Sequence, residues 1–315
     1  MIGRISGAFI LLMELSQSKH RAFTGTVLMI GDALAVIYVD VWYRLVPYTT
    51  PLVWFCLVLN ILSFITAFWI PESPSWLLTQ GRSEEASQAI DLIAKFNGKN
   101  ALKIRKFKKE SGEATEASTT PRWSCLVCTN LAFMTLNWTG SSFDYYLISF
   151  YMKYIPGSIF VNTAISSLAE ITALICSGFA MQHLGFKASF VLGFSLAAIG
   201  GFCIAFVDPD GLAIVIFILV AKAGISFAFQ ISYLAMPLLF PVEIRSTCFG
   251  VVNIFARCAT VLSPIIAEVN APTPMVIYGI LAAACAVCSL SLRPNDEKKK
   301  IVADDRSPLL ETTSQ

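Results

Sequence analysis

Charged side chains are scarce in this sequence. Asp, Glu, Lys and Arg make up 14% of the 315 residues, whereas 56% are hydrophobic, and the mean hydropathy is +0.67. A soluble globular domain has about 25% charged residues, so the composition excludes that class and predicts a polytopic membrane protein. The net charge of +2 gives no ground for nucleic-acid binding, because the basic residues are not gathered on one soluble face.

Motifs for enzymatic or metal chemistry are also missing. The sequence has no glycine-rich phosphate-binding loop, no nucleophile triad and no run of metal ligands. Its nine cysteines lie in or beside apolar segments, so no extracellular disulfide framework is expected. Cys125 and Cys128, like Cys285 and Cys288, have redox or zinc spacing, but neither pair has a nearby histidine, and we interpret them as small apolar residues. We expect no cofactor and no enzymatic activity, and we disfavour an ATP-driven pump.

Long uncharged segments dominate what is present. A helix of about 20 apolar residues crosses a bilayer core of roughly 30 Å. Segments of this kind predict an all-α fold with spans at 22–39, 52–70, 123–151, 160–181, 188–207, 212–238, 246–267 and 273–292. The run Ile5–Met13 is too short to span by itself. It has two interpretations: a signal peptide with Arg4 as its basic end, or the cytosolic half of a helix whose beginning is absent, which we favour.

Basic residues alternate between the two sides of these spans. Lys and Arg accumulate in the cytosolic loops of membrane proteins. Placing the polar segment 71–122 inside leaves eighteen basic residues inside and only Arg44 and Lys153 outside. We therefore expect a multi-pass protein whose central loop and C-terminus are cytosolic, in the plasma membrane or, as the alternative, in an endosomal or lysosomal membrane.

The stretch Pro71–Arg82 reads PESPSWLLTQGR and directly follows the uncharged segment 52–70. It resembles the central cytosolic loop of the organic cation, anion and carnitine transporter family (solute carrier family 22-like) within the major facilitator superfamily, where an Arg stands in place of Ser75. Residues 3–21, GRISGAFILLMELSQSKHR, resemble the end of the family's fourth helix, in which a Glu (here Glu14) precedes a basic cluster. The resemblance implies an incomplete major facilitator fold that lacks about three helices at its start.

The same resemblance divides the chain into four parts. It implies a partial N-terminal bundle at 1–70, a cytosolic central loop with an amphipathic helix at 71–122, a complete six-helix bundle at 123–292 and a disordered cytosolic tail at 293–315. In the tail, Asp305, Leu309 and Leu310 resemble an acidic dileucine sorting signal, which predicts a sorting adaptor as a partner.

Five ionisable residues lie inside predicted spans: Asp32, Asp144, Glu170, Lys222 and Arg257. A charge near the bilayer centre costs at least about 2.5 to 3.5 kcal/mol, so each of them needs a cavity or a partner. A polar pathway between the helices accounts for all five together. The alternative for a single residue is a structural ion pair, such as Lys222 with a nearby carboxylate.

The segment 123–151 carries Trp138, Ser142 and Tyr145 on one helical face. The rings of Trp138 and Tyr145 either box an organic ion by stacking and cation–π attraction or form a packing stripe. NWTGSSFDYYLISFY, residues 137–151, resembles the family's seventh helix, in which a Trp and a Tyr pair line the transport cavity. The resemblance implies substrate-binding roles for Trp138, Tyr145 and Tyr146. Asp144 departs from the small or apolar residue of the family and, facing inward, would make the cavity more acidic.

Two later helices carry charges at positions that matter in this family. SSLAEITAL, residues 166–174, resembles the eighth helix of the cation and carnitine branches, where a Glu faces the substrate, and this implies that role for Glu170. The anion branch has a Lys one turn further on, where this chain has Leu174, which argues against a dedicated anion carrier.

GVVNIFARCATVLSPII, residues 250–266, resembles the eleventh helix. There the residue seven before a proline is Asp in cation carriers and Arg in anion and carnitine carriers, and Arg257 stands seven before Pro264. A guanidinium can hold a carboxylate or sulfate in two parallel hydrogen bonds. Arg257 and Glu170 in one cavity would suit a zwitterion, or would neutralise each other and leave a site for a neutral or weakly charged solute.

FPVEIRSTCFGV, residues 240–251, matches the loop before that helix, with Glu243 and Arg245 in place. Two neighbouring features differ, because Leu238 replaces an acidic residue and QHLGFK at 182–187 lacks the Asp and Arg of the family's DRLGRR, the groups thought to latch the inner gate. We predict pathway or gating roles for Asp144, Lys222, Glu243 and Arg245.

The resemblance implies transmembrane transport of small organic ions (cation, anion or carnitine-like zwitterion) by alternating access of two halves around a central site. The alternative is a truncated, non-transporting membrane protein that binds or regulates an intact paralogue. The expected partners are therefore a small organic ion and the lipid bilayer, and no nucleic acid is expected.

Overall fold

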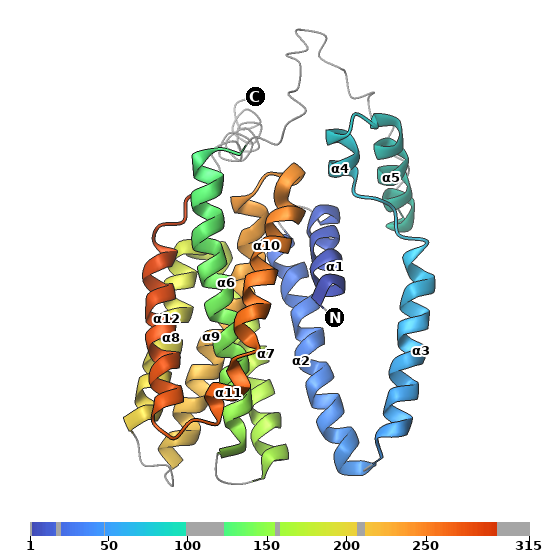
Figure 1. The fold of residues 1–315 in the computed structure, drawn as a ribbon. Helices are drawn as coiled ribbons and strands as arrows, with labels where there is room; N and C mark the ends of the chain where they lie inside the picture. Colours follow the sequence, from blue (N-terminus) through green and yellow to red (C-terminus); the bar gives the residue numbers. More distant parts are fainter. Residues whose placement is uncertain are drawn as a thin grey trace, which may run out of the picture.

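The protein is helical throughout the part that the computed structural model describes, namely residues 2–16, 20–46, 48–98, 123–154, 158–206 and 212–294. Within these ranges there is no strand. The elements, drawn in Figure 1, are α1 (Ile2–Leu15), α2 (Arg21–Leu45), α3 (Thr49–Ala67), α4 (Pro74–Thr79), α5 (Ser83–Phe96), α6 (Cys125–Tyr151), the short 3-10 helix η1 (Met152–Tyr154), α7 (Ile159–His183), α8 (Gly185–Phe206), α9 (Leu212–Leu239), α10 (Val242–Thr260), α11 (Ser263–Ala267) and α12 (Thr273–Ser289).

Each segment predicted as a span is helical. Six stretches of the described chain are long and apolar enough to cross a membrane: Ala22–Leu45, Thr49–Ala67, Phe160–His183, Gly185–Phe206, Ala213–Leu239 and Glu243–Ala267. The last of these is divided into α10 and α11 just before Pro264, because proline has no backbone N–H with which to continue the hydrogen-bond ladder. These helices confirm the predicted all-α, polytopic architecture.

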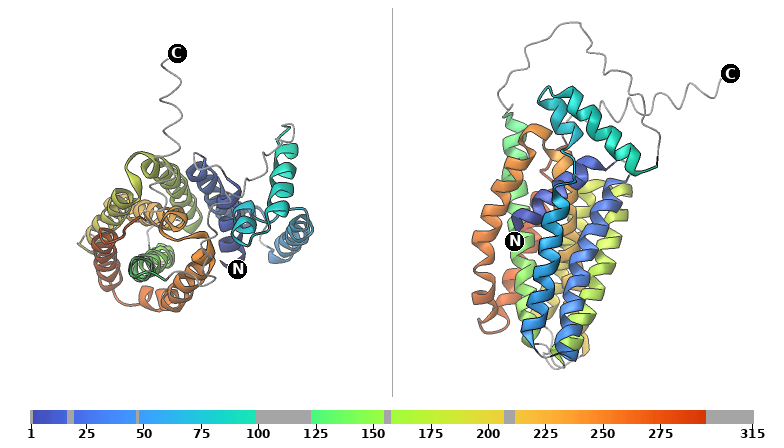
Figure 2. Two further views of the ribbon diagram at one scale, coloured as in Figure 1. Left: turned by 90° about the horizontal axis from the view of Figure 1, so that it is seen from above. Right: turned by 90° about the vertical axis from the view of Figure 1, so that its right-hand side faces the viewer.

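Helices α6 to α12 form one bundle. Seen from above, α6 lies inside a curve made by the others (Figure 2). The backbones of α8 and α9 approach closely, because a Cβ on Gly200 would lie 2.6 Å from the backbone nitrogen of Ala221 and a Cβ on Gly224 would lie 2.4 Å from that of Ala197. Both positions therefore require glycine, because any side chain would push the two backbones apart.

Polar side chains set the rotation of α6 about its own axis. The Asn130 amide donates to the Arg293 carbonyl at 2.8 Å and accepts from its N–H at 3.0 Å, and Asn137 donates to Ser289 Oγ at 3.0 Å. Residues seven apart share a helical face. Asn130, Asn137 and, seven residues later, Asp144 therefore all face α12 and the segment that follows it.

The helices before the central loop pack against this bundle to different extents. In α1, Phe9 is buried, and its ring centre lies 5.0 Å from that of Tyr233 in α9. Helix α2 lies against α7, where a Cβ on Gly178 would be 2.7 Å from Thr26 Oγ1. Helix α3 stands away from the bundle (Figure 1), and Leu52 is its one buried residue.

The central loop begins with two short helices that pack on each other. Ser73 caps α4, because its Oγ accepts from the Trp76 backbone N–H at 3.3 Å. Gly81, with a φ of 74°, turns the chain into α5. The side chains of Leu77, Ala86 and Ala89 form a small buried cluster between α4 and α5. Residues 99–122 of the expected central loop and the proposed sorting residues Asp305, Leu309 and Leu310 lie outside the described residues.

Candidate functional site

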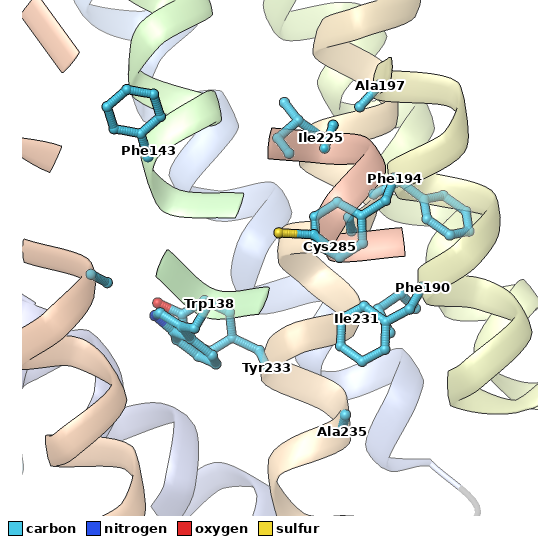
Figure 3. Close-up of a cluster of buried hydrophobic side chains, with 14 of the residues drawn as sticks. Trp138, Phe143, Phe190, Phe194, Ala197, Ile225, Ile231, Tyr233, Ala235 and Cys285 are labelled. Atoms are coloured by element: carbon cyan, nitrogen blue, oxygen red, sulfur yellow. The ribbon is translucent and has the colours of Figure 1, made fainter. Parts of the chain in front are cut away.

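An aromatic cluster occupies the inner part of the bundle and surrounds Trp138 of α6. The Trp138 ring lies 4.6 Å from Tyr233 and 6.1 Å from Phe229, both in α9, and 4.9 Å from Phe249 of α10. Trp138 is only 1% exposed, and Figure 3 shows it side by side with Tyr233. In this conformation Trp138 is a packing residue between three helices, and its role as a substrate contact stays a prediction.

Tyr145 and Tyr146 stand next to each other on α6, and each holds a different charge. The Tyr145 hydroxyl donates to Glu170 Oε1 at 2.9 Å, and the Tyr146 hydroxyl accepts from Arg257 Nη1 at 3.3 Å. Their rings meet edge to face with centres 5.6 Å apart. The tyrosine pair thereby brings the two charges predicted from sequence to neighbouring positions, with one phenol beside each.

Glu170 of α7 already has a cationic partner. Lys222 Nζ of α9 lies 3.6 Å from Glu170 Oε2, donates to Ser149 Oγ at 2.9 Å and sits 3.4 Å from the centre of the Tyr145 ring. Lys222 is 4% exposed and Glu170 is 9% exposed. The structural ion pair considered for Lys222 is therefore formed, and it satisfies most of the charge of Glu170.

Asp32 of α2 adds a second carboxylate to this cluster. It lies within electrostatic reach of both Glu170 and Lys222. If all three groups are ionised, the cluster has two negative charges and one positive charge. Sequence analysis grouped Asp32 with the buried charges but gave it no role, because nothing in the sequence indicates which helices α2 would contact.

Arg257 of α10 differs from Lys222 because no carboxylate in the described ranges lies within ion-pair distance of its guanidinium. Its one side-chain hydrogen bond among the described residues is to the Tyr146 hydroxyl, and its Cζ lies 5.5 Å from the centre of that ring. The Nε of Arg257 is buried and has no hydrogen-bond partner. Arg257 therefore keeps donors and a positive charge that an acidic group could use.

Asp144 lies on the opposite side of α6 from this cluster. It is fully buried beside Tyr278 and Cys285 of α12, and neither of its carboxyl oxygens has a hydrogen-bond partner among the residues that the structure describes. The Tyr278 hydroxyl donates elsewhere, to the Ala221 carbonyl at 2.8 Å. The structure thus places Asp144 apart from Lys222 and Arg257, and its predicted role in a pathway stays a prediction.

Arg245 and Glu243, both predicted to have pathway or gating roles, lie in different surroundings. Arg245 is buried, and its Nη1 lies 3.2 Å from Glu14 Oε1, which links α10 to α1, while its Nη2 donates to the Phe240 carbonyl at 3.4 Å. Glu243 is exposed in the first turn of α10. Arg245 therefore connects the N-terminal helices to the bundle, and Glu14 is the partner that sequence analysis did not assign to it.

A second cluster, missed by sequence analysis, lies at the opposite end of the bundle. Lys153 in η1 pairs with Glu268, which follows α11, and the Tyr154 hydroxyl donates to Glu268 Oε2 at 2.7 Å. The hydrogen bond from Lys153 lowers the pKa of the Glu268 carboxyl, and the same bond raises the pKa of Lys153. No nearby motif marks these residues, which are 115 positions apart in sequence.

A bundle of apolar helices with paired and unpaired charges between them fits the major facilitator fold. The chain belongs to the family of sugar (and other) transporters, which matches residues 3–291. The matched range begins within α1 and ends after α12.

Relatives and solved structures agree with this assignment. The chain is 32% identical over 233 residues to solute carrier family 22 member 13 of Homo sapiens, covering 71% of this chain and 42% of the relative. It is 26% identical to solute carrier family 22 member 3 of Mus musculus, covering 88% and 52%. It is 29% identical to organic cation/carnitine transporter 2 of Homo sapiens, covering 72% and 43%. The chain therefore spans about half the length of the relatives it matches, and these relatives are transporters, not enzymes.

The solved structure of the proton:xylose symporter XylE, bound to 6-bromo-6-deoxy-D-glucose, has the same fold. Its TM-score with this chain is 0.66 at 14% identity, and the likeness covers 91% of this chain and 67% of XylE. At this identity the likeness concerns the fold alone.

Proposed function

We propose that this protein binds small organic ions that carry an acidic group and moves them across a membrane by alternating access, with Arg257 as the group that holds the acid. The observation that carries the proposal is that Arg257 has a buried, unpartnered Nε and no carboxylate partner in the described part of the chain. Arginine donates two parallel hydrogen bonds to a carboxylate, and such bonds strengthen where water is excluded.

The pairing of the other charges supports Arg257 as the anchor. Lys222 is committed to Glu170 and Ser149, so it has less to offer an incoming anion. Glu170 is held by Lys222 and the Tyr145 hydroxyl, so it has less to offer an incoming cation than the sequence alone implies. Tyr146, which touches Arg257, would supply the neighbouring aromatic surface for the body of the solute.

The names of the relatives favour the same class of solute. One of them is an organic cation/carnitine transporter and another is an organic anion transporter. The distribution of Lys and Arg supports a cytosolic central loop, and the plasma membrane is the membrane that we propose. The bundle 123–292 would form one half of the carrier and the helices within 1–70 would contribute part of the other.

Arg257→Gln tests this function most directly. The purified chain is titrated with benzoate in detergent, and uptake of labelled carnitine is measured after reconstitution into liposomes. Loss of even one charge-assisted hydrogen bond, worth about 1.5 to 3 kcal/mol, predicts at least about ten-fold weaker benzoate binding. Arg82→Gln, which removes a cation from the central loop, is the matched control. Equal benzoate affinity in the parent and in Arg257→Gln would refute the role of Arg257.

A second candidate function is favoured by helix α3. Among its residues only Leu52 is buried, which leaves large side chains such as Trp54 and Phe64 exposed along a candidate membrane span. Such a surface fits a membrane protein that associates with an intact paralogue without transporting anything itself. Binding of benzoate without uptake, together with co-purification of a full-length paralogue from the same membranes, would favour this function over transport.

A further inference from the structure

A groove lies between α2 and α7 and is separate from the Tyr146–Arg257 contact. It has a volume of about 560 Å³, and its lining includes Asp32, Val36, Val39, Asp40, Tyr43 and Phe160. Tyr43 is close to the end of α2, and Phe160 is close to the start of α7. Both of these helix ends lie on the face of the bundle opposite α4 and α5 (Figure 1), so the groove is lined from that face inward to Asp32.

The charged groups in the described lining of this groove are two carboxylates from one helix, and Thr163 and Tyr43 add neutral hydroxyl groups. Asp32 and Asp40 are eight residues apart on α2, which corresponds to about 12 Å along the helix axis. Neither forms an ion pair within 4 Å among the residues that the structure describes, and this includes Arg44, one turn beyond Asp40. The walls between them are apolar, with Val36 and Val39 on α2 facing Phe160 of α7.

The inner end of the groove meets the buried ion pair. Asp32 interacts electrostatically with both Glu170 and Lys222. Because Lys222 lies 3.6 Å from Glu170 and also donates to Ser149, its charge is already engaged. Asp32, Glu170 and Lys222, with all three ionised, therefore leave one negative charge, and Asp40 adds another nearer the opening. The groove therefore has a carboxylate at its inner end and another nearer its opening.

The shape of the groove favours an organic cation over a metal ion. A divalent cation needs several oxygen ligands at about 2.0 to 2.6 Å, and two carboxylates about 12 Å apart cannot share one ion. An ammonium group with an apolar body instead places its charge near one carboxylate and its carbon surface against valine and aromatic side chains. Tyr43 and Phe160 supply ring surfaces for this contact.

We propose that the α2–α7 groove is a binding site for an organic ammonium ion, with Asp32 as its principal counter-charge and Asp40 as the second carboxylate nearer the opening. This inference rests on the proposed function and deepens it, because a solute with a cationic group for Asp32 and an acidic group for Arg257 is a zwitterion. In this proposal Asp32, and not Glu170, binds the cationic group of the solute, because Glu170 is already paired with Lys222.

Titration with tetraethylammonium tests the groove in the purified full chain. Binding is measured by isothermal calorimetry for the parent, Asp32→Asn, Asp40→Asn and Asp32→Glu, with Glu84→Gln as the matched control because Glu84 is an exposed carboxylate of α5. Asp32 is exposed to the groove, and an ion pair at such a site contributes at most about 1 kcal/mol, so we expect about three- to five-fold weaker binding in Asp32→Asn and a smaller loss in Asp40→Asn. Asp32→Glu and Glu84→Gln are expected to bind like the parent.

The outcomes separate this inference from the proposed function. Benzoate binding to Asp32→Asn shows that this variant is folded. If it does not fold, the groove site is tested by weaker tetraethylammonium binding in Asp40→Asn and parent-like binding in Asp32→Glu. The groove site is refuted if the parent shows no saturable binding of tetraethylammonium at millimolar concentrations, or if both asparagine variants bind it within about two-fold of the parent. If tetraethylammonium binding depends on Asp32 but benzoate binding is the same in the parent and in Arg257→Gln, the groove site is supported and the role of Arg257 is refuted.

Discussion

Lys222 and Glu170 form a buried ion pair, and neutralising one partner leaves the other charge without compensation. In Lys222→Met, the methionine fills most of the space of the lysine stem, so the main loss is electrostatic. Breaking a buried pair from one side costs about 3 to 5 kcal/mol. Glu170 keeps the 2.9 Å hydrogen bond from Tyr145, so we expect a loss of unfolding free energy near the lower end of that range.

The double variant Lys222→Met/Glu170→Gln separates charge from packing. Its two side chains are neutral, and the glutamine can still accept from the Tyr145 hydroxyl. Replacing a whole buried pair by neutral groups is often nearly neutral for stability, so we expect the double variant to lie within about 1 kcal/mol of the parent. The strong coupling between the two positions is measured by a double-mutant cycle.

Unfolding by sodium dodecyl sulfate in mixed micelles, followed by circular dichroism, gives the free energies for the cycle. The expected order of stability is the parent first, the double variant close behind it, and Lys222→Met well below both. The reasoning is wrong if Lys222→Met lies within about 0.5 kcal/mol of the parent, or if the double variant is no more stable than Lys222→Met alone.

Two further predictions concern packing and pH. Gly200→Val is expected to disrupt the bundle, because even a Cβ would lie 2.6 Å from the Ala221 backbone nitrogen, whereas Gly250→Ala has nothing within 4 Å and should change the unfolding free energy by less than about 1 kcal/mol; equal effects would contradict the packing. The pKa of Glu268 is lowered from 4.5 by the Lys153 hydrogen bond, so its contribution to stability is present above pH 4.5 and is lost as the pH falls through the lowered pKa. In Glu268→Gln the unfolding free energy should no longer fall as the pH is lowered through this range. The prediction is wrong if the parent and Glu268→Gln show the same dependence of unfolding free energy on pH below pH 5.

Much of the architecture was accessible from local sequence patterns. Uncharged segments such as 52–70 and 212–238 predict membrane helices because hydropathy and helix length are properties of single segments. The motif Pro71–Arg82 located the central loop for the same reason. The presence of Asp32, Glu170, Lys222 and Arg257 inside spans also followed directly, and with it the expectation that polar contacts join the helices.

Helix α6 shows what local sequence patterns do not predict, namely which neighbouring helix each side chain contacts. Trp138, Tyr145 and Tyr146 were predicted to contact a solute, yet Trp138 packs within an aromatic cluster while the two tyrosines each meet a charge. Asp144, one position before Tyr145, faces α12 instead. The rotation of α6 depends on hydrogen bonds to Arg293 and Ser289, more than 150 residues away in sequence.

The sequence by itself determined the helices, their apolar surfaces and the presence of charges within them, because these follow from residues close together along the chain. Only the tertiary structure decided that Glu170 is neutralised by Lys222, that Arg257 is left with a phenol, and that Asp32 and Asp40 line a groove. Those outcomes depend on the axial rotation and relative register of packed helices, which no single segment specifies.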